Sequence, residues 1–207
     1  MTEVKTSVIT RGVIENAYTY QEYRDMIDER MAQGKTTGDN HSEAMLHYTK
    51  MNVHRMERQD KRVKLIDEVK AALNGIDRKL IWLVLTEAWC GDAAQSLSAI
   101  QKMADYSDNI QARYILRDEH LDIMDEFLTN GKSRSIPKLI CLDAQSLDVL
   151  GSWGPRPANA QKLYDEWRSV DGIAYQDVAE KLHKWYAKDG TKSMQAEFAE
   201  KIPEWVK

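Results

Sequence analysis

The chain has 207 residues, of which 43% are hydrophobic and 30% are charged, and its formal net charge at pH 7 is −4. This length suffices for one well-buried domain with an extension, or for two small domains. The slightly negative charge gives no electrostatic reason to expect nucleic acid, and no apolar run is long enough for a membrane span. Because the chain has two cysteines and Met1–Arg11 lacks a signal-like apolar stretch, a reduced, cytoplasmic location is expected.

Two helical patterns dominate the first third of the chain. Tyr20–Gln33 is expected to be a helix, and residues 34–40 (G-K-T-T-G-D-N) a plain linker. Across Ser42–Leu73 apolar residues recur at three-and-four spacing, which predicts one long helix or two joined near residues 58–62. Because this apolar stripe needs cover, residues 1–60 are expected to form an N-terminal helical extension packed on the next domain. Docking on a partner chain is the alternative.

Residues 61–190 are expected to form the main domain, in which helical and strand patterns alternate. Its expected elements are a helix at Val63–Leu73, a strand at Lys79–Leu85, a helix at Asp92–Asp105, a strand at Ile110–Leu116, a helix at Glu119–Thr129, strands at Lys138–Asp143 and Leu147–Gly151, a helical stretch after Gly154, and a helix at Ala174–Lys188. A further helix is expected beyond this domain, at Ser193–Lys201. The strands centred on Leu83 and Ile140 lack alternation, so both are expected inside the sheet. Residues 191–207 are set apart as a C-terminal helical tail.

The most informative motif is W-C-G-D-A at residues 89–93, which follows the first apolar strand and opens a helical pattern. This order places the Cys90 thiol at a helix N-terminus, where free N–H groups and the helix dipole lower a thiol pKa. Cys90 is therefore a candidate nucleophile, expected to be accessible and flanked by Trp89. The other interpretation is a vestigial thiol on a fold retained for binding.

The motif, the order of elements and the later Ser135-Ile136-Pro137 resemble the thioredoxin superfamily, in particular a little-characterised thioredoxin-like branch. The resemblance implies an α/β fold: a three-layer α/β/α sandwich with a mixed central sheet of four strands. It also implies that a cis bond between Ile136 and Pro137 faces the thiol. In that arrangement the Ile136 backbone pairs with an extended substrate in the manner of an added strand.

Two departures from dithiol thioredoxins argue against ordinary disulfide reduction. Ala93 stands where the second cysteine would be, so a mixed disulfide on Cys90 cannot be resolved from that position. Val84 stands where those proteins bury a carboxylate. Cys141 lies four residues beyond Pro137 on a strand, about 13 Å away at ~3.3 Å per residue, too far for a disulfide. Cys141 is therefore expected to be a buried core residue.

Three charged residues are expected near the thiol. Asp92 lies in the first helical turn, where it can be a cap residue that turns to solvent or a proton shuttle. The resemblance brings the loops that carry Arg134 and Arg156 to the thiol's face. Two guanidiniums there could hold a carboxylate from a small thiol or an acidic peptide. Ordinary surface arginines are the alternative.

The histidines of the N-terminal region do not predict a metal site. Glu43, His47 and His54 fall near one helical face, and His41 precedes them, but the spacing is not that of a ligand cluster. Solvated or capping histidines are expected, with no metal and no cofactor.

These features predict a monothiol thiol–disulfide oxidoreductase, or a protein that forms a mixed disulfide, through Cys90. The partners expected are a protein or low-molecular-weight disulfide and an external thiol reductant, with no nucleic acid and no membrane. The alternatives are a non-catalytic thioredoxin-fold binding module and a thiol-based redox sensor. Reactivity of Cys90 separates the binding module from the other two, and turnover separates the oxidoreductase from the sensor.

Overall fold

The computed structural model describes residues 8–207. Residues 1–7, which include much of Met1–Arg11 and the start of the expected extension, lie outside the described residues. The helices are α1 (Arg11–Asn16), α2 (Tyr20–Ala32), α3 (Glu43–Arg62), α4 (Asp67–Asn74), α5 (Gly91–Tyr106), α6 (Leu121–Glu126), α7 (Ala158–Arg168), α8 (Tyr175–Asp189) and α9 (Lys192–Trp205), with a 3₁₀ turn η1 (Arg117–Glu119). The strands are β1 (Leu80–Thr86), β2 (Ile110–Leu116), β3 (Lys138–Asp143) and β4 (Val149–Trp153).

A mixed sheet in the order β2-β1-β3-β4 forms the centre of the molecule. β1 pairs parallel with β2 and antiparallel with β3, so that Leu83 lies opposite Ile140, and β3 pairs antiparallel with β4. Every residue of β1 and β3 is buried, because helices cover both faces of the sheet. The prediction that these two strands are internal is confirmed.

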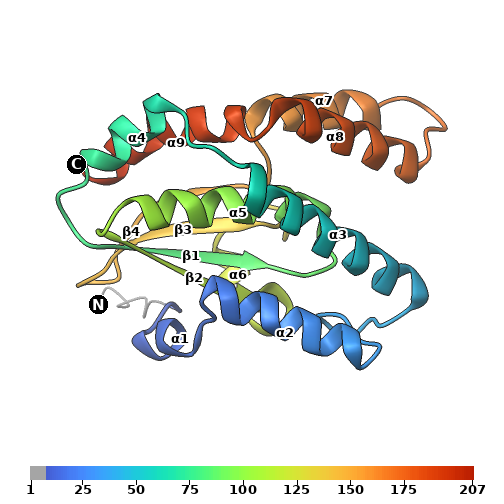
Figure 1. Cartoon of the computed structure of the whole chain (residues 1–207), viewed down its shortest axis with the longest axis horizontal. Helices are drawn as coiled ribbons and strands as arrows, with labels where there is room; N and C mark the ends of the chain where they lie inside the picture. The colour runs from blue at the N-terminus through green and yellow to red at the C-terminus, as the bar shows by residue number, and fades with distance from the viewer. Residues whose placement is uncertain (1–7) are drawn as a thin grey trace, which may run out of the picture.

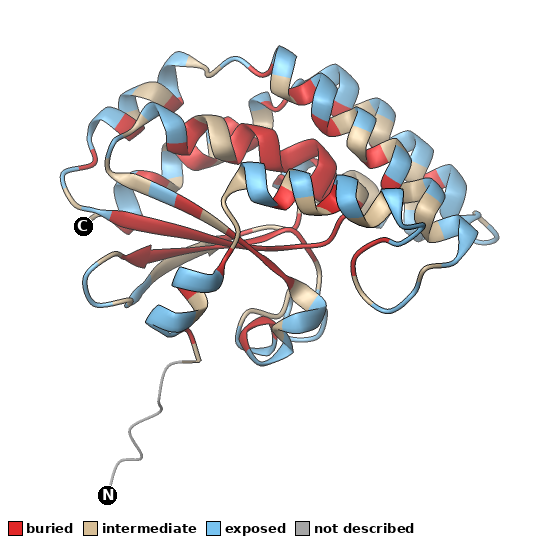
Figure 2. Ribbon diagram, turned by 60° about the horizontal axis from the view of Figure 1, so that its bottom comes forward, coloured by how far each residue is buried: buried red, intermediate tan, exposed pale blue. Residues whose placement is uncertain are grey.

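The layers are those of an α/β/α sandwich, with additions on one side (Figure 1). α1, α2 and α6 cover one face, and α5 lies on the other (Figure 1). α5 is itself covered by outer helices, so that residues 92–100 are all buried (Figure 2). The predicted fold class is confirmed, and the outer helices form a further layer on the α5 side. Among residues 8–207 no helix is long and apolar enough to cross a membrane.

Two boundaries differ from the sequence expectation for local reasons. The helix expected at Glu119–Thr129 is shorter, because the non-helical backbone of His120 (φ −133°, ψ 52°) separates η1 from α6, which ends at Glu126. The last strand starts at Val149 rather than Leu147, which has a positive φ of 66°. The Asp143 carboxylate accepts the two backbone N–H groups that close the turn before Leu147, at 2.8 Å each.

The N-terminal helices pack on the domain, as predicted. Tyr23 of α2 is fully buried and stacks on Tyr114 of β2, and Met56 of α3 is 2% exposed. The stripe of apolar residues divides into α3 and α4, which is one of the two alternatives left open by its charged centre. Residues 34–40 connect α2 and α3 without helix or strand, as predicted, but the linker is packed rather than free. Thr37 in this segment is buried and accepts a hydrogen bond from the Ala88 backbone N–H, so the segment packs beside the end of β1.

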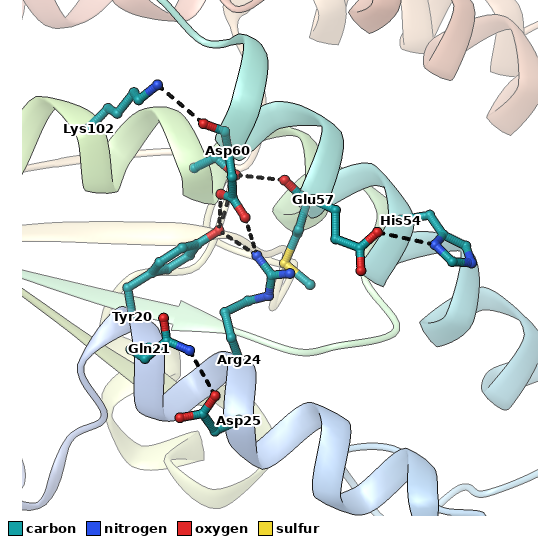
Figure 3. Close-up of polar contacts among 10 residues, drawn as sticks. Tyr20, Gln21, Arg24, Asp25, His54, Glu57, Asp60 and Lys102 are labelled. Carbon is teal, nitrogen blue, oxygen red and sulfur yellow. Dashed lines mark hydrogen bonds and ion pairs between the residues drawn. The ribbon is translucent and has the colours of Figure 1, made fainter.

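A polar cluster ties α2, α3 and α5 together (Figure 3). The Tyr20 hydroxyl donates to an Asp60 carboxylate oxygen at 2.7 Å, and the Arg24 guanidinium pairs with the same carboxylate. Lys102 of α5 donates to the Asp60 backbone carbonyl at 3.2 Å. Burial raises the pKa of Tyr20 to about 12, so its hydroxyl stays protonated and acts as the donor in this hydrogen bond. The three helices are thus joined by directed bonds as well as by apolar contact.

The two ends of the C-terminal region have different surroundings. α9, which the sequence analysis set apart as a tail, belongs to the main core: Phe198 and Trp205 pack against Trp82 with ring centroids 5.4 and 6.4 Å away. A Cβ at Gly151 of β4 would lie 2.0 Å from Trp205 Nε1, so this contact requires glycine. α7 and α8 form a hairpin with its own small apolar cluster, which includes Tyr186.

Candidate functional site

Cys90 is the N-cap residue of α5, directly after the end of β1, as predicted. Its thiol donates to the backbone carbonyl of Ile136 at 3.3 Å. The Ile136–Pro137 peptide bond is cis. The Ile136 carbonyl oxygen, which would accept a hydrogen bond from an added substrate strand, therefore already accepts one from the Cys90 thiol.

The predicted accessible thiol with a depressed pKa is wrong. Cys90 is 9% exposed, and burial, with the Asp92 carboxylate adding to it, raises the pKa of the thiol to about 12. The backbone N–H groups of Asp92 and Ala93 lower the pKa, as the helix position predicted, but they are the weaker effect. Desolvation disfavours the charged thiolate more than the helix terminus favours it. In this conformation Cys90 is a protonated thiol.

Asp92 does not turn to solvent. Its carboxylate is buried, pairs with the Arg156 guanidinium at 2.8 Å and accepts from the Tyr186 hydroxyl at 2.7 Å. Burial raises the pKa of Asp92, while Arg156 and Tyr186 act in the opposite direction. Asp92 therefore joins the first turn of α5 to the loop before α7 and to α8, a role that the sequence did not predict.

A cavity of about 450 Å³ lies in front of the thiol. The predicted site residues Trp89, Cys90, Asp92, Arg134, Ile136 and Arg156 all line it. The remaining walls come from α3 and from the α7–α8 hairpin, which extend beyond the end of the sheet at which β1 finishes (Figure 1). The structure thus brings together the residues that the sequence proposed, and adds walls that it did not.

The guanidiniums of Arg134 and Arg156 both form ion pairs with carboxylates of the chain. Arg134 pairs with Asp125 at 2.6 Å, and Arg156 pairs with Asp92 and stacks 4.1 Å from the Tyr164 ring centroid. Both arginines of the carboxylate-binding hypothesis are therefore already paired with carboxylates of the chain itself. Arg117, which stacks 4.9 Å from the Trp89 ring centroid, is likewise paired with its neighbour Asp118.

Arg55 and His183 are among the polar residues of the cavity that sequence reasoning missed. Arg55 comes from α3, and His183 comes from α8. Burial and the neighbouring Arg55 and Arg58 lower the pKa of His183 to about 4, so its imidazole is neutral at pH 7. No local pattern marks either residue, because their helices meet α5 only through tertiary packing.

A family model described as thioredoxin matches residues 38–168, more than half of the chain. The chain belongs to the thioredoxin family. Two crystal structures resemble this thioredoxin-family protein with a TM-score of 0.52 and 18% sequence identity, each covering 90% of this chain and 98% of its own. One is a protein of unknown function from Pseudomonas aeruginosa and the other an HIV epitope-scaffold. These likenesses concern the fold alone, and no curated protein matches.

The second cysteine of this thioredoxin-family chain lies away from the site. Cys141 is fully buried in β3, opposite Trp82 of β1, and both cysteines are free. Ala93, at the position of a second motif cysteine, is buried in α5, and Val84 is buried in β1.

The histidines of the N-terminal region lie apart from the thiol. The His41 ring nitrogen accepts from the Thr36 backbone N–H at 3.3 Å, and His54 lies 3.4 Å from Glu57, while His47 is exposed. Within residues 8–207 no group of three or more His, Cys, Asp or Glu side chains lies together as metal ligands would.

Proposed function

We propose that this thioredoxin-family protein exchanges Cys90 with a low-molecular-weight disulfide and that an external thiol then regenerates it. The observation that supports this proposal is the place of the sulfur. Cys90 lines a cavity of about 450 Å³, beside the cis Ile136–Pro137 bond. A cavity of this volume is within the range that holds small molecules.

The walls of the cavity favour a small substrate over a protein strand. Residues of α3 and of the α7–α8 hairpin line the cavity together with Cys90 and Ile136, so the thiol and the cis bond face a walled cavity. The Ile136 carbonyl already accepts the Cys90 thiol. A small disulfide needs only to enter the cavity and displace that one hydrogen bond.

The chemistry is two successive thiol–disulfide exchanges. Cys90 gives up its proton, and its sulfur attacks one sulfur of the disulfide. The disulfide bond breaks, a mixed disulfide forms on Cys90, and the leaving thiolate takes a proton. An external thiol then attacks the mixed disulfide and releases Cys90. Asp92, which lines the same cavity, is the candidate for carrying the proton between Cys90 and the leaving sulfur.

The non-catalytic binding module is the second candidate, and the burial of Cys90 favours it. A thiol with its pKa raised to about 12 is a thiolate only in a minute fraction of molecules at neutral pH. In this alternative the cavity binds a ligand without bond exchange. The redox sensor shares the chemistry of the first step and lacks the second.

Intact-mass measurement distinguishes these functions. The native protein is incubated with neutral bis(2-hydroxyethyl) disulfide, with Cys90→Ser and Cys141→Ser as matched variants. We expect one adduct on the wild type and on Cys141→Ser, and none on Cys90→Ser. An excess of small thiol should remove the adduct and permit repeated cycles. The absence of any adduct on native protein supports the binding module, and an adduct that forms without turnover supports the sensor.

A further inference from the structure

Arg55 differs from the other arginines of the cavity. Arg117, Arg134 and Arg156 each pair with a carboxylate, at 2.6, 2.6 and 2.8 Å. Arg55 has no carboxylate within ion-pair distance in the part of the chain that the structure describes, and burial, with the charge of Arg58 adding to it, lowers the pKa of its guanidinium. A partly buried guanidinium without an acidic partner is costly, and a bound anion offsets that cost.

Two hydrogen bonds through Asn52 fix the position of the Arg55 side chain. Its Nη1 donates to the Asn52 amide oxygen at 2.7 Å, and the Asn52 Nδ2 donates to the Ala88 carbonyl at 2.9 Å. Asn52 is fully buried, so this chain of bonds is shielded from water. A guanidinium carries five N–H donors, and the bond to Asn52 leaves others for a ligand.

A second donor is fixed by a relay of amides. Gln59 Nε2 donates to Gln95 Oε1 at 2.8 Å, which orients the Gln95 amide. The Gln95 Nε2 then lies 3.3 Å from His183 Nδ1. Because an amide nitrogen only donates, Nδ1 must accept, and the neutral imidazole carries its proton on Nε2. The relay makes His183 Nε2 a hydrogen-bond donor.

These two donors converge beside the reactive sulfur. A Cβ at Gly91 would lie 2.9 Å from His183 Nε2 and 3.8 Å from Arg55 Nη1. Gly91 is the residue directly after Cys90, and all four residues line the same cavity. A glycine at this position therefore lets the imidazole lie directly against the backbone of α5, with the Arg55 guanidinium close by.

We propose that Arg55 and His183 bind a carboxylate of the low-molecular-weight disulfide, so that the substrate class is a short-chain acidic disulfide. This inference rests on the proposed function for its substrate. The carboxylate lies in the cavity between the Arg55 guanidinium and the His183 Nε2–H, beside Gly91, while a sulfur a short carbon chain away faces Cys90. Arg134 and Arg156, the residues first proposed for this role, instead hold their own carboxylates.

Calorimetric titration of the Cys90→Ser protein tests the recognition without the chemistry. The two ligands are 3,3′-dithiodipropionate, a dianion, and bis(2-hydroxyethyl) disulfide, its neutral counterpart. We expect the dianion to bind about tenfold more tightly or better, because hydrogen bonds to charged groups are the strong ones. Equal affinity for the two ligands would overturn the inference.

Two substitutions in the Cys90→Ser protein locate the subsite. Arg55→Gln should abolish the preference for the dianion and leave affinity for the neutral disulfide unchanged. Arg58→Gln is the matched control, because Arg58 is exposed on the same helix and outside the cavity lining, and removes the same charge. If both variants lose the dianion preference equally, the preference comes from general electrostatic attraction to positive charge, and the proposed subsite is overturned. His183→Leu should weaken dianion binding several-fold.

Adduct formation on the wild type separates this inference from the proposed function. If the neutral disulfide forms the Cys90 adduct and the Cys90→Ser protein shows no dianion preference, the exchange function stands and the carboxylate subsite fails. If no adduct forms and the dianion preference is present and lost in Arg55→Gln, the subsite stands and the exchange function fails.

Discussion

At Cys90 two effects on the thiol pKa oppose each other, and their sizes decide the state of the site. The helix N-terminus lowers the pKa through direct N–H contacts, whereas burial and Asp92 raise it to about 12. The thiolate must therefore form when substrate enters or the cavity opens. In this conformation the thiol is protonated, and it becomes a better nucleophile only if its burial or the negative charge beside it is reduced.

The pH dependence of alkylation tests this balance. Below a thiol's pKa the thiolate fraction rises about tenfold per pH unit. Because the pKa of Cys90 is raised from 9.0 to about 12, its reaction with iodoacetamide should keep accelerating through pH 10 without levelling. The rate is measured by mass spectrometry in Cys141→Ser protein. A rate that levels near pH 9 or below would contradict the raised pKa.

Asp92→Asn should increase the reactivity of Cys90 and decrease the stability of the protein. Removing the carboxylate charge lowers the Cys90 pKa, so alkylation at a fixed neutral pH becomes faster. The substitution also leaves the buried Arg156 unpaired, which costs about 3–5 kcal/mol of unfolding free energy. Mass spectrometry gives the first effect and urea denaturation the second.

The control for Asp92→Asn is Asp125→Asn. Asp125 and Arg134 form an exposed pair, so this loss should stay within about 1 kcal/mol. Cys141 reports on unfolding in the same experiment, because it is fully buried. If Cys141 is alkylated as fast as Cys90 in Asp92→Asn protein, the acceleration comes from unfolding and not from the pKa.

At the scale of elements, a helix from the end of the chain, α9, packs on the sheet and forms part of the core. Phe198 and Trp205 of α9 pack on Trp82, and Gly151 of β4 provides the space for the Trp205 ring. Gln195 of α9 also accepts the backbone N–H of Ile66 at 2.8 Å, at the start of α4. α9 is therefore part of the domain.

Gly151→Ala should destabilise the protein by about 1–3 kcal/mol, the usual cost of overpacking. The added Cβ would meet the Trp205 ring at 2.0 Å and force it out of the core. Gly12→Ala is the matched control, because a Cβ at Gly12 in α1 makes only ordinary contact at 3.7 Å. That control should be neutral or slightly stabilising. Chemical denaturation compares the two, and equal stabilities would contradict the packing of α9.

At the scale of the whole molecule, added helices turn the face of a thioredoxin fold into an enclosed site. α3 supplies Arg55 and α8 supplies His183, and both helices pack toward α5 from outside the sheet. The same helices explain why Cys90 is buried. The proposed carboxylate subsite and the raised pKa of Cys90 thus have one structural cause.

Removal of residues 1–60 should destabilise the whole domain. The truncation exposes Tyr114 and the outer side of α5, which α2 and α3 cover. We expect a clearly lower melting temperature or no cooperative transition, measured by circular dichroism. An unchanged melting temperature would instead support the alternative that these helices dock on a partner chain.

The sequence by itself determined the local parts of this protein. The apolar runs around Leu83 and Ile140 specify buried strands, and the order of strand, Cys90 and helix places the thiol at a helix N-terminus. The motif, the order of the elements and Pro137 were enough to predict the fold class and the part of the cavity lining that surrounds the thiol. These features depend on residues close together in the chain, so periodicity and motif spacing reveal them.

Only the tertiary structure decided the chemical state of the site. Arg55 and His183 approach Gly91 from helices that are distant in the sequence, and no local pattern records that approach. The pKa of Cys90 is likewise set by how completely distant segments exclude water from it. Desolvation and ion pairing depend on three-dimensional proximity, which is why the sequence predicted the position of the thiol correctly and its pKa in the wrong direction.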